Sequence, residues 1–122
     1  MFNRYKVGQL GEDYAKTYLQ DKGYRIVAQH HTSQWGELDI VAKKSNKLVF
    51  IEVKTRVGLG KGYPFEAVTR TKVRHLMRSI QYFLLKNDYR GYKLSLDVVS
   101  VLLNQDYTLK QIKHYETLLP NL

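Results

Sequence analysis

The sequence predicts an α/β fold in which two helices flank a mixed β-sheet. Apolar residues recur at helical spacing from Val7 to about Lys22 and from about Thr71 to Lys86, and Gly23 marks the end of the first stretch. Because a hairpin pairs antiparallel while a strand that arrives after a helix can pair parallel, the element order α-β-β-β-α-β-β favours mixed pairing. The expected strands are Tyr24–Gln29, Leu38–Lys43, Leu48–Thr55, Leu94–Leu103 and Gln111–Tyr115, with a polar turn from His30 to Gly36.

Length and composition predict one globular domain over residues 1–122. The chain is 43% hydrophobic and 25% charged, close to the averages of globular proteins, so we expect a packed core. It has no cysteine, which excludes a disulfide scaffold, a thiolate nucleophile and cysteine-ligated metal sites. No apolar run approaches the roughly 20 residues that span a bilayer and no signal-like segment opens the chain, so we expect a cytoplasmic protein without membrane contact.

The charge balance indicates a polyanionic partner. Lysines and arginines number 20 and acidic residues 11, which gives a net charge of +9. Residues 54–81 hold most of the excess, with seven basic residues against Glu66, or +6. On the second helix Arg74 and Arg78 are expected to face outward with Lys72 at the flank, a face that can bind phosphates or simply be solvated.

The second and third strands carry the residues that indicate chemistry. If Lys44–Lys47 form a four-residue loop, Asp39 lies opposite Glu52 and Glu37 opposite Lys54, all on one face. Opposed carboxylates destabilise a sheet unless a cation neutralises them, and Mg²⁺ prefers carboxylate oxygens. The alternative is an ordinary surface hairpin with a Glu37–Lys54 ion pair, and a register slip of one residue would turn Asp39 to the other face.

Two motifs resemble a known family. The segments Gly36–Ala42 (GELDIVA) and Val49–Arg56 (VFIEVKTR) closely resemble the YraN-like family of bacterial proteins, within the PD-(D/E)xK nuclease superfamily, and the resemblance extends over most of the chain. It implies a restriction-endonuclease-like αβββαβ core, with Asp39 and Glu52 as metal ligands and Lys54 as the catalytic lysine. The sequence is also similar to archaeal Holliday junction resolvases, which bind branched DNA as dimers, so a homodimer is an expectation.

Further residues complete the expected site. The resemblance implies that Glu12, on the first helix, adds to the metal site, although a solvated carboxylate there is the alternative. The Val53 carbonyl is expected to help hold Mg²⁺ or Mn²⁺. The residues expected to bind the nucleic acid are Arg56, Lys72, Arg74 and Arg78.

The function predicted from these observations is a metal-dependent endonuclease that hydrolyses DNA and favours branched, flapped or single-stranded structure. The alternatives are a non-catalytic nucleic-acid-binding or partner-recruiting module with a nuclease fold, and an RNA-directed nuclease. Trp35, beside the proposed site, either stacks against DNA or packs over the hairpin. The four histidines show no metal-ligand spacing and are expected to be solvated or hydrogen-bonded.

Overall fold

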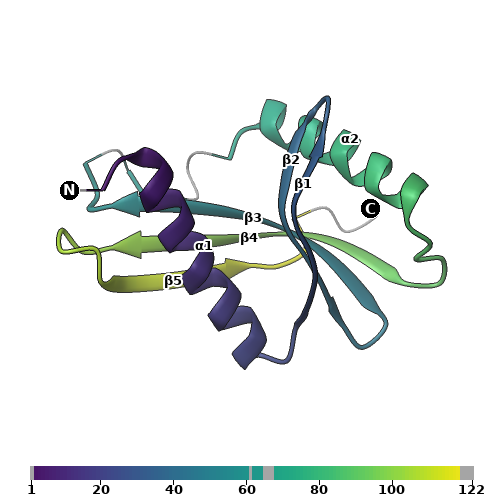
Figure 1. Ribbon diagram of the computed structural model, residues 1–122, viewed down its shortest axis with the longest axis horizontal. Coiled ribbons are helices and arrows are strands. Elements are labelled where there is room, and N and C mark those ends of the chain that lie inside the picture. The colour runs from purple at the N-terminus through teal and green to yellow at the C-terminus, as the bar shows by residue number, and fades with distance from the viewer. Residues whose placement is uncertain (1, 61, 65–67, 119–122) are drawn as a thin grey trace.

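The computed structural model describes residues 2–60, 62–64 and 68–118, so Lys61 and Glu66 of the basic segment lie outside the described residues. Its element order is the predicted one (Figure 1). None of the helices in this described part of the chain is long and apolar enough to cross a membrane. The elements are α1 (Arg4–Asp21), β1 (Arg25–Ser33), β2 (Gly36–Lys44), β3 (Lys47–Val57), α2 (Arg70–Lys86), β4 (Lys93–Leu103) and β5 (Leu109–Tyr115).

One five-stranded sheet, in the order β1-β2-β3-β4-β5, forms the centre of the fold. Only the β3–β4 pair among these described strands is parallel, so the sheet is mixed, as predicted. This α/β architecture, a mixed sheet with two helices, is consistent with a restriction-endonuclease-like core.

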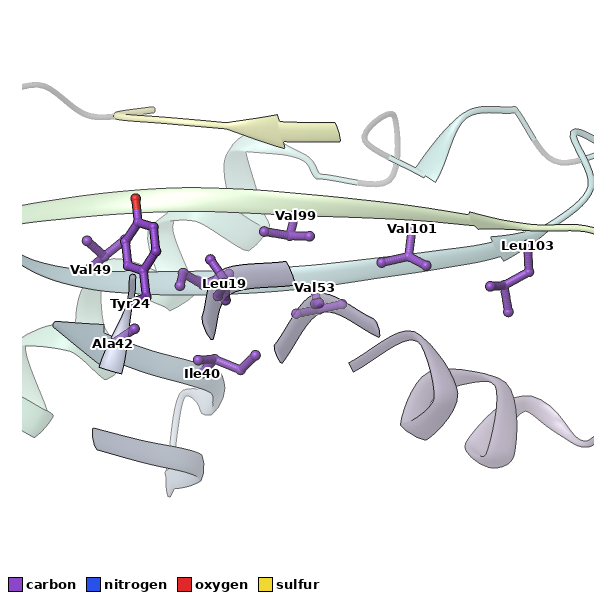
Figure 2. Packing of buried hydrophobic residues seen from close by; sticks show 11 residues of the cluster. Leu19, Tyr24, Ile40, Ala42, Val49, Val53, Val99, Val101 and Leu103 are labelled. Atoms are coloured by element: carbon purple, nitrogen blue, oxygen red, sulfur yellow. The ribbon is translucent and has the colours of Figure 1, made fainter. Parts of the chain in front are cut away.

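Each helix covers its own hydrophobic cluster. Because side chains alternate along β3, Val49 and Ile51 pack with α1 while Leu48 and Phe50 pack with α2. Figure 2 shows the α1 cluster, where Leu19 lies among strand residues of the sheet. The two central strands are therefore covered on both faces, which gives a rigid base for side chains at their ends.

Helix α1 lies close against β3 at Gly11. A Cβ atom on Gly11 would lie 1.8 Å from Thr55 Oγ1, so a side chain at this position cannot be accommodated without movement. The neighbouring Glu12 is thereby brought toward β3, at the level of Lys54 and Thr55, with which it lines one cleft.

The structure corrects two predicted boundaries. The turn expected from His30 onward is instead the end of β1, which pairs with β2 as far as Ser33 and Gly36. The sequence did not predict this part of β1 as a strand because its side chains are polar. This end of β1 is largely exposed and needs no apolar face. The hairpin loop has two unpaired residues rather than four, since Lys44 pairs with Lys47 and Ser45 takes the positive φ of 55° that a tight turn needs.

The β2–β3 ladder ends early. Its register is the predicted one, with Lys43 opposite Leu48, but the last pair is Ile40 and Ile51. Beyond this pair β2 turns away with β1 toward α2, while β3 continues beside β4 (Figure 1). Asp39 and Glu52 therefore lie where the sheet divides and are not a ladder pair, and the predicted pairing of Glu37 with Lys54 is wrong.

Candidate metal centre and basic cleft

Asp39 lies at the division of the sheet and reaches across to β3. Its Oδ2 accepts a hydrogen bond of 2.9 Å from the backbone N–H of Val53. Burial is the largest cause that raises the pKa of Asp39 to about 8, and the neighbouring Glu52 and Glu12 add to it, against the opposing effects of the Val53 N–H and Lys72. A carboxyl group in this environment ionises readily only when further positive charge arrives.

Glu52 is nearly inaccessible, with 3% of its surface exposed. Its Oε1 atom lies 3.3 Å from Lys54 Nζ and 3.5 Å from Lys72 Nζ. Its Oε2 atom is buried and has no hydrogen-bond partner among the residues that the structure describes. A buried carboxylate oxygen without a partner is costly, so this position favours a further cation.

Glu12 approaches the site from α1. Its Oε2 atom lies 3.4 Å from His30 Nε2, and its Oε1 atom is buried without a partner in the described part of the chain. Burial raises the pKa of Glu12, and the carboxylates of Glu37, Asp13 and Glu52 raise it further, although His30 opposes them.

His30 links two carboxylates beside the site. Its Nδ1 lies 2.8 Å from Glu37 Oε1 while its Nε2 faces Glu12, and its φ of 51° is in the left-handed region. The hydrogen bond with Glu37 is the largest cause that raises the pKa of His30. Glu37 is therefore paired with a β1 histidine and not with Lys54.

This donor set fits a hard divalent cation. Within the described ranges Glu12 and Glu52 each leave one buried oxygen without a partner, and Asp39 has a strongly raised pKa. Magnesium and manganese take oxygen ligands of this kind, and their charge would offset the repulsion among the three carboxylates. The residues that could hold such an ion are Asp39, Glu52, Glu12 and the Val53 carbonyl.

Two of the three carboxylates border an open basic cleft of about 610 Å³, and the buried Glu52 does not line it. Glu12 and Asp39 line it together with Arg4, Lys54 and Arg56. The Arg56 Nε atom is buried and has no partner among the described residues, so its guanidinium retains donor capacity. A neighbouring hollow of about 420 Å³ shares Gly8 and Glu12 with the cleft and extends it toward His30.

The basic residues predicted on the second helix separate into two groups. Lys72 contacts Glu52 and so belongs to the acidic site itself. Arg74 and Arg78 are exposed on α2 and do not line the cleft. The sequence missed Arg4 as a cleft residue and His30 as the partner of Glu12, because both contacts depend on how α1 and β1 pack.

Comparison with known proteins assigns the chain to a family. The profile of the "uncharacterised protein family UPF0102" matches residues 11–101. The chain belongs to the UPF0102, or YraN, family. A UPF0102 protein of Persephonella marina is 37% identical over 84% of this chain and 89% of its own length, and one of Caldicellulosiruptor saccharolyticus is 42% identical over 84% and 86%. The resemblance seen in the two sequence motifs is thus confirmed.

This UPF0102 protein has a second cluster of possible metal ligands, away from the cleft. Asp97, His114 and Glu116 each offer a ligand atom within 4.8 Å of the others, a spacing that Glu12, Asp39 and Glu52 do not reach. The buried Asp97 already accepts hydrogen bonds of 2.6 Å from Ser95 Oγ and 2.9 Å from Thr117 N, and its Oδ2 lies 2.7 Å from His114 Nε2. The cluster can hold a metal, but Asp97 is satisfied without one.

This second cluster could not be predicted, because the register between the last two strands is not apparent from the sequence. His114 and Glu116 are two residues apart, so they lie on the same face of β5 and its continuation. Val99 of β4 pairs with His114. That pairing, invisible in the sequence, brings His114 to Asp97. The expectation that His114 is hydrogen-bonded is confirmed, but its proximity to two carboxylates was missed.

Proposed function

We propose that this UPF0102 protein is a metal-dependent endonuclease that hydrolyses DNA. The observation that carries the proposal is a buried carboxylate oxygen on each of Glu12 and Glu52 that has no partner among the described residues. Glu12 lines an open basic cleft with Asp39 and Lys54, and Glu52 lies behind it, 3.3 Å from Lys54 Nζ. Membership of a family with a nuclease fold supports it.

The cation is the first component of the proposed site. Asp39, Glu52 and the Val53 carbonyl would hold Mg²⁺ or Mn²⁺, with Glu12 as a further ligand. When bound, such an ion supplies positive charge that activates water and stabilises the charge developing on a phosphate. The raised pKa of Asp39 supports this assignment, because a cation would favour the ionised carboxylate.

The basic side chains are the second component. Lys54 Nζ, 3.3 Å from Glu52, is placed to orient the attacking water and to stabilise negative charge on the phosphate. The water oxygen bonds to phosphorus, the bond from phosphorus to one sugar oxygen breaks, and a proton passes to the departing oxygen. Arg56 and Arg4, which line the cleft, would hold phosphate oxygens of the bound strand, and Lys72 would balance the charge of Glu52.

The exposed arginines of α2 are the third component. Arg74 and Arg78 lie outside the cleft, so we assign them to phosphates beyond the cleaved one. Such contacts add affinity without reading sequence, which supports selection of branched, flapped or single-stranded DNA by shape. A homodimer would present two such sites to a branched substrate.

Cleavage of labelled four-way junction, flap and single-stranded DNA tests the proposal. With Mg²⁺ or Mn²⁺ the wild-type protein is expected to cut at least one of them, and chelation is expected to stop cutting. Glu52→Gln and Lys54→Ala should reduce the rate at least about a hundredfold, the usual scale for removing one electrostatic group from such a site. RNA substrates of the same sequence and structure determine whether cleavage requires deoxyribose.

Asp13→Asn is the matched control, because Asp13 is an exposed carboxylate next to Glu12 on α1. It should cut at the wild-type rate, whereas Glu12→Gln should be slower. Binding that persists in Asp39→Ala and without metal, together with no cutting of any substrate, would replace the nuclease by a nucleic-acid-binding module.

A further inference from the structure

A small aromatic pocket lies outside the acidic site, between the tip of the β1–β2 hairpin and α2. The hairpin tip is fixed to the helix by a hydrogen bond of 3.1 Å between Ser33 Oγ and Ser79 Oγ, and Ser33 Oγ also accepts from the Trp35 N–H at 3.2 Å. The pocket encloses about 220 Å³. It is lined by Trp35, Arg78, Gln81, Tyr82 and Leu85.

These side chains combine flat apolar surface with hydrogen-bond donors. The rings of Trp35 and Tyr82 meet edge to face, at an angle of 62° with 6.3 Å between their centroids, so the two rings are not stacked on each other. Arg78 and Gln81 are exposed at the rim and can bond the edge of a planar polar ring. The volume is below the range of about 300–1,000 Å³ typical of sites for drug-sized ligands, which favours a single ring system.

The charge around the pocket is positive. No acidic side chain is among its described lining residues, and Arg78 is one of them. The Lys86 ammonium lies over the Tyr82 ring at 5.2 Å from its centroid. A ligand that carries a flat ring and a phosphate therefore complements the pocket better than an apolar side chain of a protein partner.

The pocket and the acidic site both lie beside α2. Lys72 contacts Glu52 at the start of the helix, and Tyr82 follows ten residues later, about 15 Å away at 1.5 Å per residue. The side chains of Arg74, Arg78 and Gln81 are exposed at helical spacing between these two points. This distance corresponds to about four nucleotides of a stacked strand and to fewer of an extended one.

We propose that the Trp35–Tyr82 pocket binds one unpaired nucleobase of the strand whose phosphate lies at the acidic site. The inference rests on the proposed function and deepens it, because a paired base presents no free face for stacking. The pocket thus selects DNA with a single-stranded segment next to the cleaved bond.

Trp35 is the chain's single tryptophan, so its fluorescence reports directly on this pocket. In the test, metal-free protein is titrated with unlabelled dT8, with an abasic oligomer of eight residues and with a blunt duplex. We expect dT8 to change the Trp35 emission saturably, and the abasic oligomer and duplex to leave it almost unchanged. Binding of labelled dT8, followed by anisotropy, should weaken about tenfold in Trp35→Ala and in Tyr82→Leu, the scale of one lost base stack.

Arg90→Ala is the matched control for Arg78→Ala, because Arg90 is an exposed arginine beyond the end of α2 that pairs with Asp88. Only Arg78→Ala should weaken dT8 binding. The proposal is overturned if the Trp35 emission stays unchanged while anisotropy reports binding. Equal binding of the abasic oligomer, or an emission change caused by self-association of the protein, overturns it as well. Because this titration contains no metal, it is independent of cleavage. A protein that cuts DNA but shows no change in Trp35 emission disproves only base binding by the pocket. A protein that shows the emission change but never cuts DNA disproves only the nuclease function.

Discussion

Asp39 Oδ2 accepts a hydrogen bond from the Val53 N–H across the point where β2 and β3 part. The bond holds a carboxyl group close to Glu52 and Glu12, in surroundings that raise its pKa to about 8. Asp39 therefore contributes a hydrogen-bond acceptor to the fold and a charge to the site. Substitutions can separate the two contributions.

Asp39→Asn and Asp39→Ala are expected to change stability in opposite directions. Asparagine keeps an oxygen for the Val53 N–H but removes a charge that Glu52 and Glu12 repel, so metal-free protein at pH 8 should unfold at higher temperature. Alanine leaves the Val53 N–H without its partner and should cost about 1–3 kcal/mol. Thermal unfolding in chelator measures both, and equal destabilisation by the two variants contradicts this account.

The stability of metal-free protein is expected to fall as pH rises. The pKa of Asp39 is raised from 3.8 to about 8 on folding, so between these values the folded state retains a proton that the unfolded state has lost. The free energy of unfolding should then decrease by up to about 1.4 kcal/mol per pH unit in this window. Urea unfolding at several pH values measures the slope. Asp39→Asn should make the free energy of unfolding less dependent on pH. An equally steep slope in that variant would mean that other groups cause the pH dependence.

Divalent cations are expected to stabilise the protein, most strongly at alkaline pH. An ion that binds only the folded state at a hundred times its dissociation constant adds about 2.7 kcal/mol. Mn²⁺ or Mg²⁺ should therefore raise the unfolding temperature of wild type, and chelator should reverse the rise. The rise should be absent in Asp39→Asn. A rise that disappears instead in Glu116→Gln would place the ion at the Asp97 cluster.

The hairpin shows how far the sequence alone could lead. Side-chain alternation and the loop position predicted the register from Lys43 and Leu48 to Val41 and Phe50, which the structure confirms. The alternation does not reveal where two strands stop pairing, because that depends on the packing of β2 with α2. For this reason the predicted Glu37–Lys54 pairing was wrong while Asp39 and Glu52 still came together near Val53.

Contacts between elements distant in sequence were less predictable. The family resemblance implied that Glu12 adds to the site, and the structure buries its Oε1 atom. Its neighbour His30 was expected in a turn, because nothing in a polar segment shows that a strand continues through it. Pairing of β5 with β4 likewise decides that His114 meets Asp97. Local pattern therefore predicted which elements form, and tertiary packing decided most partners.

Gly11→Ala is expected to disrupt the site by moving α1. The new Cβ would lie 1.8 Å from Thr55 Oγ1, so the helix must shift, with Glu12 on it. We expect a loss of at least about 2 kcal/mol in the free energy of unfolding, as for an overpacked core. Gly8→Ala is the matched control, since nothing lies within 4 Å of its Cβ and alanine favours the helix by about 1 kcal/mol. Urea unfolding measures the stability of both alanine variants. Thr55→Gly should partly restore the stability of Gly11→Ala, because it removes the side chain that the new Cβ meets. Similar stability of the two alanine variants would mean that the close approach of Gly11 to Thr55 does not constrain the helix.

Asp97→Asn is expected to destabilise the fold without acting on the cleft. Burial alone would raise the pKa of Asp97, but hydrogen bonds from His114, Ser95 and the Thr117 N–H outweigh it and lower that pKa. The stabilisation is therefore present above the ordinary value of 3.8 and is lost as pH falls below it. Removing the charge of this buried, hydrogen-bonded carboxylate should cost about 3 kcal/mol at pH 7. Urea unfolding measures the loss, which should shrink as pH falls toward 3, and the exposed Glu116→Gln should change stability little. An equal loss at both pH values would show that shape, and not the charge of Asp97, joins β5 to β4.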